Sequence, residues 1–151
     1  MKHFALIGYP LGHSLSAKYF AEKFSAEGIE AEYSLLPIEH AEEVLPHCET
    51  LSGFNVTIPH KQSIIPFLSA ISEEAEAIGA VNCVKVTNEG LIGYNTDIEG
   101  IRKSLEGITL EGAKALVLGT GGASKAVQYA LREGGAEVAV VSRTKGVADL
   151  T

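Results

Sequence analysis

Short polar segments interrupt the apolar first part of the chain, and they carry groups that can bind a ligand. They lie at residues 12–16, 55–61 and 94–97, with Asn82 before the last of them. Hydroxyl and amide groups in this arrangement suit a small polyhydroxylated or carboxylated molecule. Each group alone is also compatible with a structural role, as a helix cap or as a partner of backbone groups. The candidate ligand-binding residues are Ser14, Ser16, Asn55, Thr57 and Asn82.

A glycine-rich turn indicates a second kind of site, for the phosphates of a dinucleotide. Gly119 permits a tight turn and Gly121 lets a ligand approach the backbone, while the helix that follows offers free N–H groups and the positive end of its dipole. Ser124 replaces the third glycine of the usual G-x-G-x-x-G pattern, and Ala126 allows close helix packing. Glycines needed for backbone reasons alone are the alternative. The candidate cofactor-binding residues of this turn are Gly119, Gly121, Gly122 and Ala123.

Arg143 bears on which dinucleotide this turn binds. It follows the second predicted strand of this part of the chain, where an NAD site usually carries an acidic residue for the ribose hydroxyls. A guanidinium instead binds a 2′-phosphate through two hydrogen bonds and stacks on adenine, so NADP is favoured over NAD. Ser142 and Thr144 offer hydroxyl groups to the same phosphate. A solvated arginine in a surface loop is the alternative.

Alternating strands and helices must position these groups. Apolar runs and helical periodicities alternate up to residue 78, and Asn88-Glu89-Gly90 indicates a hairpin. Loops at the carboxyl ends of parallel strands share one edge of a sheet, so the polar segments are expected to converge on one crevice. Pro46 is predicted to cut one helix, Pro59 to end one strand and Ser72 to cap one helix. The predicted strands are 2–8, 31–38, 53–58, 80–87 and 91–95, and the predicted helices are 16–26, 41–48 and 72–78.

The chain changes character after residue 107. A helix at 97–105, capped by Thr96 or Asp97, precedes a strand–helix–strand unit at 114–118, 121–133 and 137–141. The predicted fold class is α/β, with a substrate-binding domain of mostly parallel sheet over residues 1–107 and the start of a Rossmann-type doubly wound domain over residues 108–151. One such unit leaves a sheet edge and apolar faces uncovered. We therefore expect the chain to be the N-terminal part of a longer protein.

Composition bears on the class of partner. The 151 residues carry 12 basic and 19 acidic side chains, a formal net charge of −7 and 46% apolar residues, which is enough for a core. A negative charge disfavours nucleic acid, and neither a membrane span nor a signal peptide is expected. Cys48 and Cys83 have no metal-type spacing and are interpreted as apolar fillers in a reducing compartment. We expect a cytoplasmic protein that binds small molecules, without a metal, a membrane or a nucleic-acid partner.

Five ordered motifs give the chain a specific resemblance. They read His-Ser-Leu-Ser at 13–16, Asn-Val-Thr-Ile-Pro-His-Lys at 55–61, Gly-Ala-Val-Asn at 79–82, Tyr-Asn-Thr-Asp at 94–97 and Leu-Gly-Thr-Gly-Gly-Ala-Ser-Lys-Ala at 118–126. In this order they resemble the shikimate dehydrogenase family, over essentially the whole chain. The resemblance implies NADP-dependent, reversible reduction of 3-dehydroshikimate to shikimate in the aromatic amino-acid (chorismate) pathway.

The resemblance also implies a role for each candidate residue. The two serines would bind the shikimate carboxylate, and the threonine and amide candidates would complete the substrate site. Lys61 and Asp97 would form the catalytic pair, about one hydrogen bond apart across the substrate hydroxyl that is oxidised. Which of the two carries the proton stays open, because strongly coupled groups titrate as a unit.

Some features depart from the family pattern. Ala17 stands where the family often has proline, and Ser142 stands where it has asparagine before Arg-Thr. The family's remaining nucleotide-binding strands and a glutamine of the substrate site would lie beyond Thr151, so we expect the isolated chain to be inactive. A quinate/shikimate dehydrogenase relative that uses NAD and a non-catalytic domain that binds a shikimate-type ligand are the alternatives. Paired serines favour shikimate, and the presence of Lys61 and Asp97 favours an enzyme, either a monomer or a homodimer.

Overall fold

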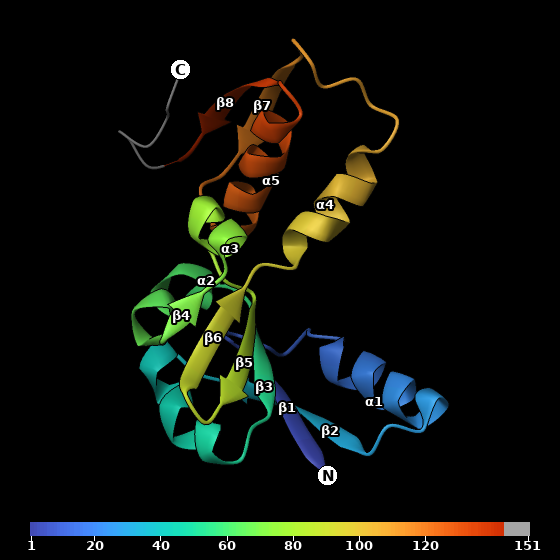
Figure 1. Ribbon diagram of the computed structural model, residues 1–151, viewed down its shortest axis with the longest axis vertical. Helices are drawn as coiled ribbons and strands as arrows, with labels where there is room; N and C mark the ends of the chain where they lie inside the picture. The colour runs from blue at the N-terminus through green and yellow to red at the C-terminus, as the bar shows by residue number, and fades with distance from the viewer. Residues whose placement is uncertain (144–151) are drawn as a thin grey trace.

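The computed structural model describes residues 1–143, which form two parts along one long axis (Figure 1). The strands are β1 (Lys2–Gly8), β2 (Ala31–Pro37), β3 (Gly53–Val56), β4 (Ala70–Ile71), β5 (Cys83–Thr87), β6 (Gly90–Tyr94), β7 (Lys114–Leu118) and β8 (Glu137–Val141). The first part holds a six-stranded sheet in the order β2-β1-β3-β5-β6-β4, and the second holds β7 and β8. The predicted α/β class with a mostly parallel sheet is confirmed.

Strand direction explains why the polar segments meet. β1 pairs in parallel with β2 and β3, β5 is antiparallel to β3, and β6 is antiparallel to β5. The predicted hairpin is thus confirmed, and β6 runs in the same direction as β1 and β3. The carboxyl ends of β1, β3 and β6 and the start of β5 consequently lie at one edge of the sheet, which we call the site edge.

The helices depart from the predictions in a few places. Pro46 does not cut its helix, because this segment adopts the tighter 3-10 geometry of η1 and contains the proline. β3 ends at Val56 and not at Pro59 as predicted, because the chain turns at Thr57 into α2. The short elements α2, β4 and η2 were not predicted. In residues 1–143, each helix is too short or too polar to cross a membrane. The helices are α1 (Ser16–Glu27), η1 (Ala41–Glu49), α2 (His60–Ser63), η2 (Ile65–Phe67), α3 (Glu73–Ile78), α4 (Asp97–Leu105) and α5 (Gly122–Glu133).

An apolar cluster anchors the strands of the site edge. Ala5 and Ile7 of β1, Phe54 and Val56 of β3, and Val84 of β5 are buried and belong to this cluster. Full burial of a large apolar side chain contributes roughly 1.5–3 kcal/mol relative to exposure. The strand ends that carry the polar groups are therefore held by deep packing beneath the sheet.

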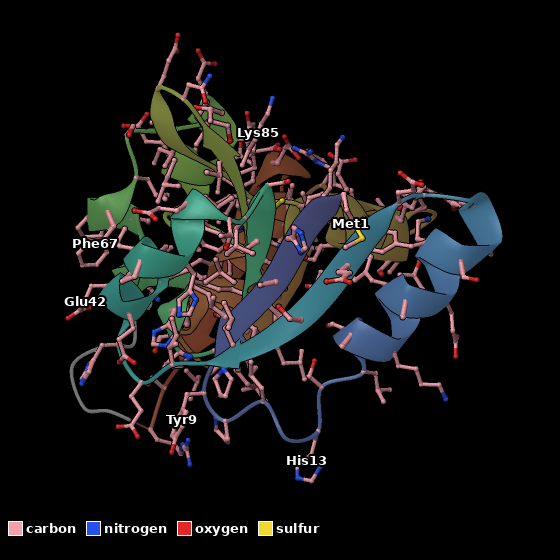
Figure 2. The ribbon with its side chains drawn as sticks, turned by 90° about the horizontal axis from the view of Figure 1, so that it is seen from below. Met1, Tyr9, His13, Glu42, Phe67 and Lys85 are labelled. Carbon is pink, nitrogen blue, oxygen red and sulfur yellow. The ribbon has the colours of Figure 1, made fainter. Side chains whose placement is uncertain are left out.

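Aromatic side chains attach α1 to the β2 edge of the sheet. α1 contains no fully buried residue. The Phe20 ring stacks on Tyr33 with a centroid distance of 4.3 Å, and Phe24 packs against Phe4 at 6.0 Å. Figure 2 shows α1 lying beside β2 at the margin of the sheet. Ser16, the first residue of α1, is held there by ring contacts rather than by a deep core.

The second part is the predicted strand–helix–strand unit. β7 and β8 pair in parallel, and α5 connects them. Leu131 of α5 packs in one apolar cluster with Val117 of β7 and with Val138 and Val140 of β8. The unit predicted for residues 114–141 is confirmed, and it places the start of α5 after the carboxyl end of β7.

Small side chains bring the second part close to the first. Ala126 and Ala130 of α5 are buried against Ile78 of α3 and Ile98 of α4. The predicted close packing of Ala126 is therefore confirmed. Arg102 of α4 adds hydrogen-bonded ion pairs to carboxylates of α3 and α5, although partly exposed pairs contribute only about 0–1 kcal/mol each. A division of the chain into domains at residue 107 stays a prediction.

The two predicted helix caps stand at their expected positions but differ in their hydrogen bonds. Ser72 caps α3, since its Oγ accepts a hydrogen bond from the Ala75 N–H at 3.2 Å. For α4, Thr96 stands at the N-cap position as predicted, but its side chain makes no capping hydrogen bond, and Asn95 Oδ1 accepts from the Ile98 N–H at 3.3 Å. Thr96 and Asp97 direct their side chains into the site edge instead.

Candidate active site

Lys61 and Asp97 form an ion pair at the site edge. The Lys61 Nζ donates to Asp97 Oδ2 at 2.5 Å, and the two side chains are 14% and 28% exposed. Lys61 comes from α2, just after β3, whereas Asp97 opens α4, just after β6. The direction of the strands therefore brings together residues that are far apart in the sequence. Partial burial strengthens the pair and still leaves one side open to a ligand.

Asn82 fixes the other oxygen of Asp97. Its Nδ2 donates to Asp97 Oδ1 at 2.9 Å and to Thr96 Oγ1 at 3.0 Å. Its Oδ1 accepts from the Thr96 N–H at 2.7 Å. Both carboxylate oxygens of Asp97 are thus bound, which sets the plane of the carboxylate. Asn82 was predicted as a ligand-binding residue, and the structure gives its side chain the additional task of orienting Asp97.

Asn55 extends this network toward α1. Its Nδ2 donates to the Asn82 carbonyl at 3.3 Å, and its Oδ1 accepts from the Tyr33 hydroxyl at 2.9 Å. Tyr33 itself stacks on Phe20 of α1. Sequence reasoning missed Tyr33 and Thr96 as parts of the site. The sequence shows Tyr33 only as an aromatic residue in a predicted strand. Thr96 lies in the Tyr-Asn-Thr-Asp motif, of which only Asp97 was predicted to belong to the site.

The remaining predicted binding residues, Ser14, Ser16 and Thr57, each carry a hydroxyl group. Ser14 Oγ accepts from the Ser16 N–H at 3.3 Å, and α1 begins without a side-chain cap. The hydroxyls of Ser16 and Thr57 make no hydrogen bond to protein within residues 1–143, and both residues are half-buried. Thr57 lies directly after β3, against Gly8 at the end of β1. These hydroxyls are available to a ligand, whereas capping does not explain Ser16.

The loop between β1 and α1 borders the same edge. Figure 2 shows it leaving the sheet near Tyr9 and passing His13, whose side chain points outward. The Tyr9 N–H donates to the Ile58 carbonyl at 3.0 Å, which ties this loop to the segment after β3. The serines of the loop and Thr57 therefore belong to neighbouring segments of the site edge.

His60 anchors the backbone that carries Lys61. The imidazole is 2% exposed, and its Nε2 lies 2.8 Å from the Ile38 carbonyl, so this nitrogen carries the proton and donates. The Lys61 carbonyl accepts from the Val81 N–H at 2.7 Å. Backbone contacts on both sides thus fix the position of Lys61.

The glycine-rich turn follows β7, as predicted, and its groups fit a dinucleotide. Gly119 has φ +104°, and a β-carbon at Gly119 or Gly121 would meet no atom of residues 1–143 within 4 Å. Ser124, which replaces the usual third glycine, closes the turn by donating from Oγ to the Gly119 carbonyl at 2.6 Å. Backbone N–H groups at the start of α5 and open space above the glycines are the features a pyrophosphate requires. Ala123 is exposed at the same helix start.

A cleft of about 630 Å³ extends from this turn to the end of β8. Arg143 is exposed at its rim, and Ser142 is half-buried there. Thr144, the third residue predicted for the phosphate, lies outside the described residues. The cleft is lined by Leu118, Gly119, Thr120, Gly121, Val141, Ser142 and Arg143.

The two cysteines are free thiols outside the hydrogen-bond network of the site. Cys48 and Cys83 are both half-buried. Burial raises the pKa of each thiol above its usual range, because desolvation disfavours the thiolate. A thiol kept protonated is a poor nucleophile, so the cysteines fit the packing role predicted for them.

Fold and geometry define the class of protein: an α/β protein with a polar ligand site at one sheet edge and a dinucleotide-type turn beside it. A family model described as the shikimate dehydrogenase substrate binding domain matches residues 6–84. The chain belongs to the shikimate dehydrogenase family, which confirms the resemblance seen in its motifs.

Individual relatives agree with this assignment. A shikimate dehydrogenase (NADP(+)) from Carboxydothermus hydrogenoformans is 44% identical over 147 residues, covering 92% of this chain and 52% of the relative. Shikimate dehydrogenase 1 from Peptoclostridium difficile superimposes with a TM-score of 0.86 at 35% identity, covering 96% of this chain and 58% of that one. The Thermus thermophilus enzyme in complex with NADP(H) and shikimate gives a TM-score of 0.83 at 39% identity, with coverages of 95% and 57%. The chain spans about half the length of the curated relatives it matches.

Tyr33 gives the site a measurable dependence on alkaline pH. Burial raises the pKa of its phenol well above the usual 10.0, with the neighbouring Cys83 adding to the effect. The unfolded chain therefore ionises first, so the stability that Tyr33 contributes is complete below pH 10 and is lost as the pH rises above it. Between pH 9 and pH 11 the parent chain should lose about 1 kcal/mol more unfolding free energy than Tyr33→Phe, measured by urea denaturation.

Tyr19→Phe is the matched control for this experiment. Tyr19 lies on α1 with 59% of its surface exposed, so its removal should leave the pH dependence of the parent intact. A Tyr33→Phe chain that loses as much stability as the parent would show that the phenol is not protected in the folded state.

Proposed function

We propose that this chain is the substrate-binding and cofactor-turn part of an NADP-dependent shikimate dehydrogenase, which interconverts 3-dehydroshikimate and shikimate. The observation that carries the proposal is the Lys61–Asp97 pair, oriented by Asn82 and placed beside the glycine-rich turn. A proton-transferring pair next to a dinucleotide site is what oxidation of a hydroxyl requires. The names of the relatives, and the NADP(H) and shikimate held by the Thermus enzyme, support the same reaction.

The substrate site is assigned by the chemistry of its groups. Ser14 and Ser16 bind the carboxylate of the substrate, because paired hydroxyl donors match its two oxygens. Thr57 offers its hydroxyl, which has no hydrogen-bond partner within residues 1–143, and Asn55 offers the second hydrogen of its Nδ2, to hydroxyl groups of the ring. Asn55 is held in place for this by Tyr33. A small polyhydroxylated carboxylate satisfies all of these groups at once.

Lys61 and Asp97 handle the proton of the reacting hydroxyl. In reduction the Lys61 ammonium donates a proton to the carbonyl oxygen, and in oxidation the neutral amine accepts the hydroxyl proton. Asp97 orients Lys61 through Oδ2, while Asn82 prevents the carboxylate from rotating through its bond to Oδ1. Bound NADP supplies the hydride chemistry at the substrate carbon. Positioned in this way, the pair exchanges its proton without a large movement of either side chain.

The nucleotide is held by the turn and by the rim of the cleft. Gly119, Gly121 and the start of α5 take the pyrophosphate, and Arg143 with Ser142 takes the 2′-phosphate that distinguishes NADP from NAD. Thr144 completes this phosphate site in the proposal. Open space at the glycines and the exposed guanidinium beside the cleft are the features that support it.

Affinity for shikimate tests the proposal on the purified chain. Ser16→Ala should weaken shikimate binding about 10-fold or more in isothermal titration, because a hydrogen bond to a carboxylate is worth roughly 1.5–3 kcal/mol. Its unfolding free energy should change little, since the Ser16 hydroxyl has no protein partner within residues 1–143. Ser25→Ala, at an exposed position of the same helix, is the control and should bind like the parent. A parent chain that binds quinate as well as shikimate, or binds neither, contradicts the proposal.

Catalysis can be measured in a chimera that joins this chain to the remaining part of the Carboxydothermus relative. Lys61→Ala in the chimera should lower kcat by roughly 10²–10⁴-fold with little change in KM, as expected for loss of a positioned acid/base. Lys18→Ala removes an exposed lysine of α1 and should leave kcat unchanged. If Lys61→Ala keeps kcat within about threefold, the proton travels by another route and the role of the pair has to be withdrawn.

Cofactor choice depends on Arg143 in this proposal. The parent chain should bind NADP more tightly than NAD by about one to two decades, the value of a charge-assisted bidentate contact. Arg143→Asp should erase or reverse that preference in fluorescence or calorimetric titrations. Arg132→Asp, an exposed change on α5 of the same charge type, should preserve it. Equal affinities of the parent for both nucleotides would exclude the assignment of Arg143.

The cytoplasmic location, and the choice between monomer and homodimer, stay predictions. Shikimate and NADP are the small-molecule partners that the proposal assigns to the chain.

A further inference from the structure

The glycines of the turn meet different surroundings. Gly119 adopts a positive φ, and Gly121 faces open space, so a ligand explains both of them. Gly122 has neither property. It is the first residue of α5 and lies in ordinary helical conformation, which alanine adopts at least as well as glycine. Another reason must account for glycine at position 122.

The side chain of Lys61 fills the space beside Gly122. A β-carbon at Gly122 would lie 2.6 Å from Lys61 Cβ, 3.0 Å from its Cδ and 3.3 Å from its Cγ. Three atoms of the lysine stem thus run along the bare Cα of the glycine. The nearest of them is Cβ, the end of the side chain that is fixed to the backbone, so a rotamer change of Lys61 cannot relieve the contact.

Neither backbone can retreat. Lys61 is held by the bond from the Val81 N–H to its carbonyl and by the buried ring of its neighbour His60. On the other side, α5 is seated against α3 and α4 through the buried Ala126 and Ala130. Any side chain at position 122 must therefore displace Lys61, and with it the Nζ that reaches Asp97 Oδ2.

We infer that Gly122 is a positioning residue for Lys61: its bare backbone forms the wall that directs the lysine stem toward Asp97. This assignment deepens the proposed function, on which the catalytic role of Lys61 rests. It also links the two halves of the site, because the residue that opens the cofactor-side helix is the one that limits where the lysine can lie. The start of α5 faces the sheet end that carries α2 (Figure 1).

Lysine NH₃⁺ signals in ¹H–¹⁵N NMR spectra of the full chain report directly on the pair. The Lys61 ammonium, held by Asp97, should give a slowly exchanging signal that is identified by its loss in Lys61→Gly. Gly122→Ala should remove or broaden this signal, whereas Gly100→Ala should keep it, because a β-carbon at this exposed position of α4 meets no atom of the described residues within 4 Å. Gly122→Ala should also weaken shikimate binding about 10-fold, and Gly100→Ala should not weaken it.

A double-mutant cycle, with Tm as the readout, distinguishes this contact from a general defect of α5. With Lys61 present, Gly122→Ala should lower Tm by about 3–10 °C, the range expected for overpacking in a chain of this size. In the Lys61→Gly background the same change should leave Tm unchanged or raise it, since the clashing atoms are gone and alanine is the better helix former. If Gly122→Ala fails to fold with Lys61 but folds with Gly at position 61, the assignment is supported.

An equal loss of Tm in both backgrounds, or a Lys61 signal that survives Gly122→Ala, would overturn the assignment. These two measurements need no ligand. If the parent chain fails to bind shikimate, the proposed function is wrong, while the contact between Gly122 and Lys61 is still decided by the cycle.

Discussion

A carboxylate at a partly buried sheet edge needs a partner for each of its oxygens, and Asp97 has them in Lys61 and Asn82. The rest of the site depends on this arrangement. Asn82 reaches Asp97 because it precedes β5, the strand that pairs with both β3 and β6. Lys61 reaches it because the chain turns back immediately after β3. A change in the register of the hairpin would therefore separate Lys61 from Asp97, although each residue would remain at its place in the sequence.

The sequence was sufficient for most of the secondary structure, because alternation, helical periodicity and turn residues are local signals. β1, β7 and β8 have the predicted bounds, and Ser72 caps its helix as predicted. The errors arise where a tertiary contact decides. Thr96 stands at the N-cap of α4 as predicted, but its side chain binds Asn82 instead of the helix, and Asn95 Oδ1 accepts from the Ile98 N–H; no local rule shows that competition.

The candidate site was predicted as a set of residues but not as a network. Motif residues such as Asn55 and Asn82 were expected to bind a ligand, and the structure shows that much of their hydrogen-bonding capacity is spent on each other and on Asp97. From the sequence alone, Gly122 was predicted to bind the cofactor, like its neighbour Gly121. Only the packing of α5 against Lys61 separates the two, because a glycine that faces a ligand and a glycine that faces a side chain look identical in a sequence.

The weakest support of the site lies at α1, which carries Ser16 but has no buried residue. The position of α1 is set in part by the stacking of the Phe20 ring on Tyr33. The Tyr33 hydroxyl in turn donates a hydrogen bond to Asn55 Oδ1. The Ser16 hydroxyl and the Asn55 amide are consequently linked through two aromatic side chains. A ligand that binds both groups gains from that link, because fixing one end of the site also fixes the other. An aromatic pair contributes roughly 0.5–1.5 kcal/mol beyond its buried area, so these ring contacts help to hold α1, and with it Ser16, at the sheet.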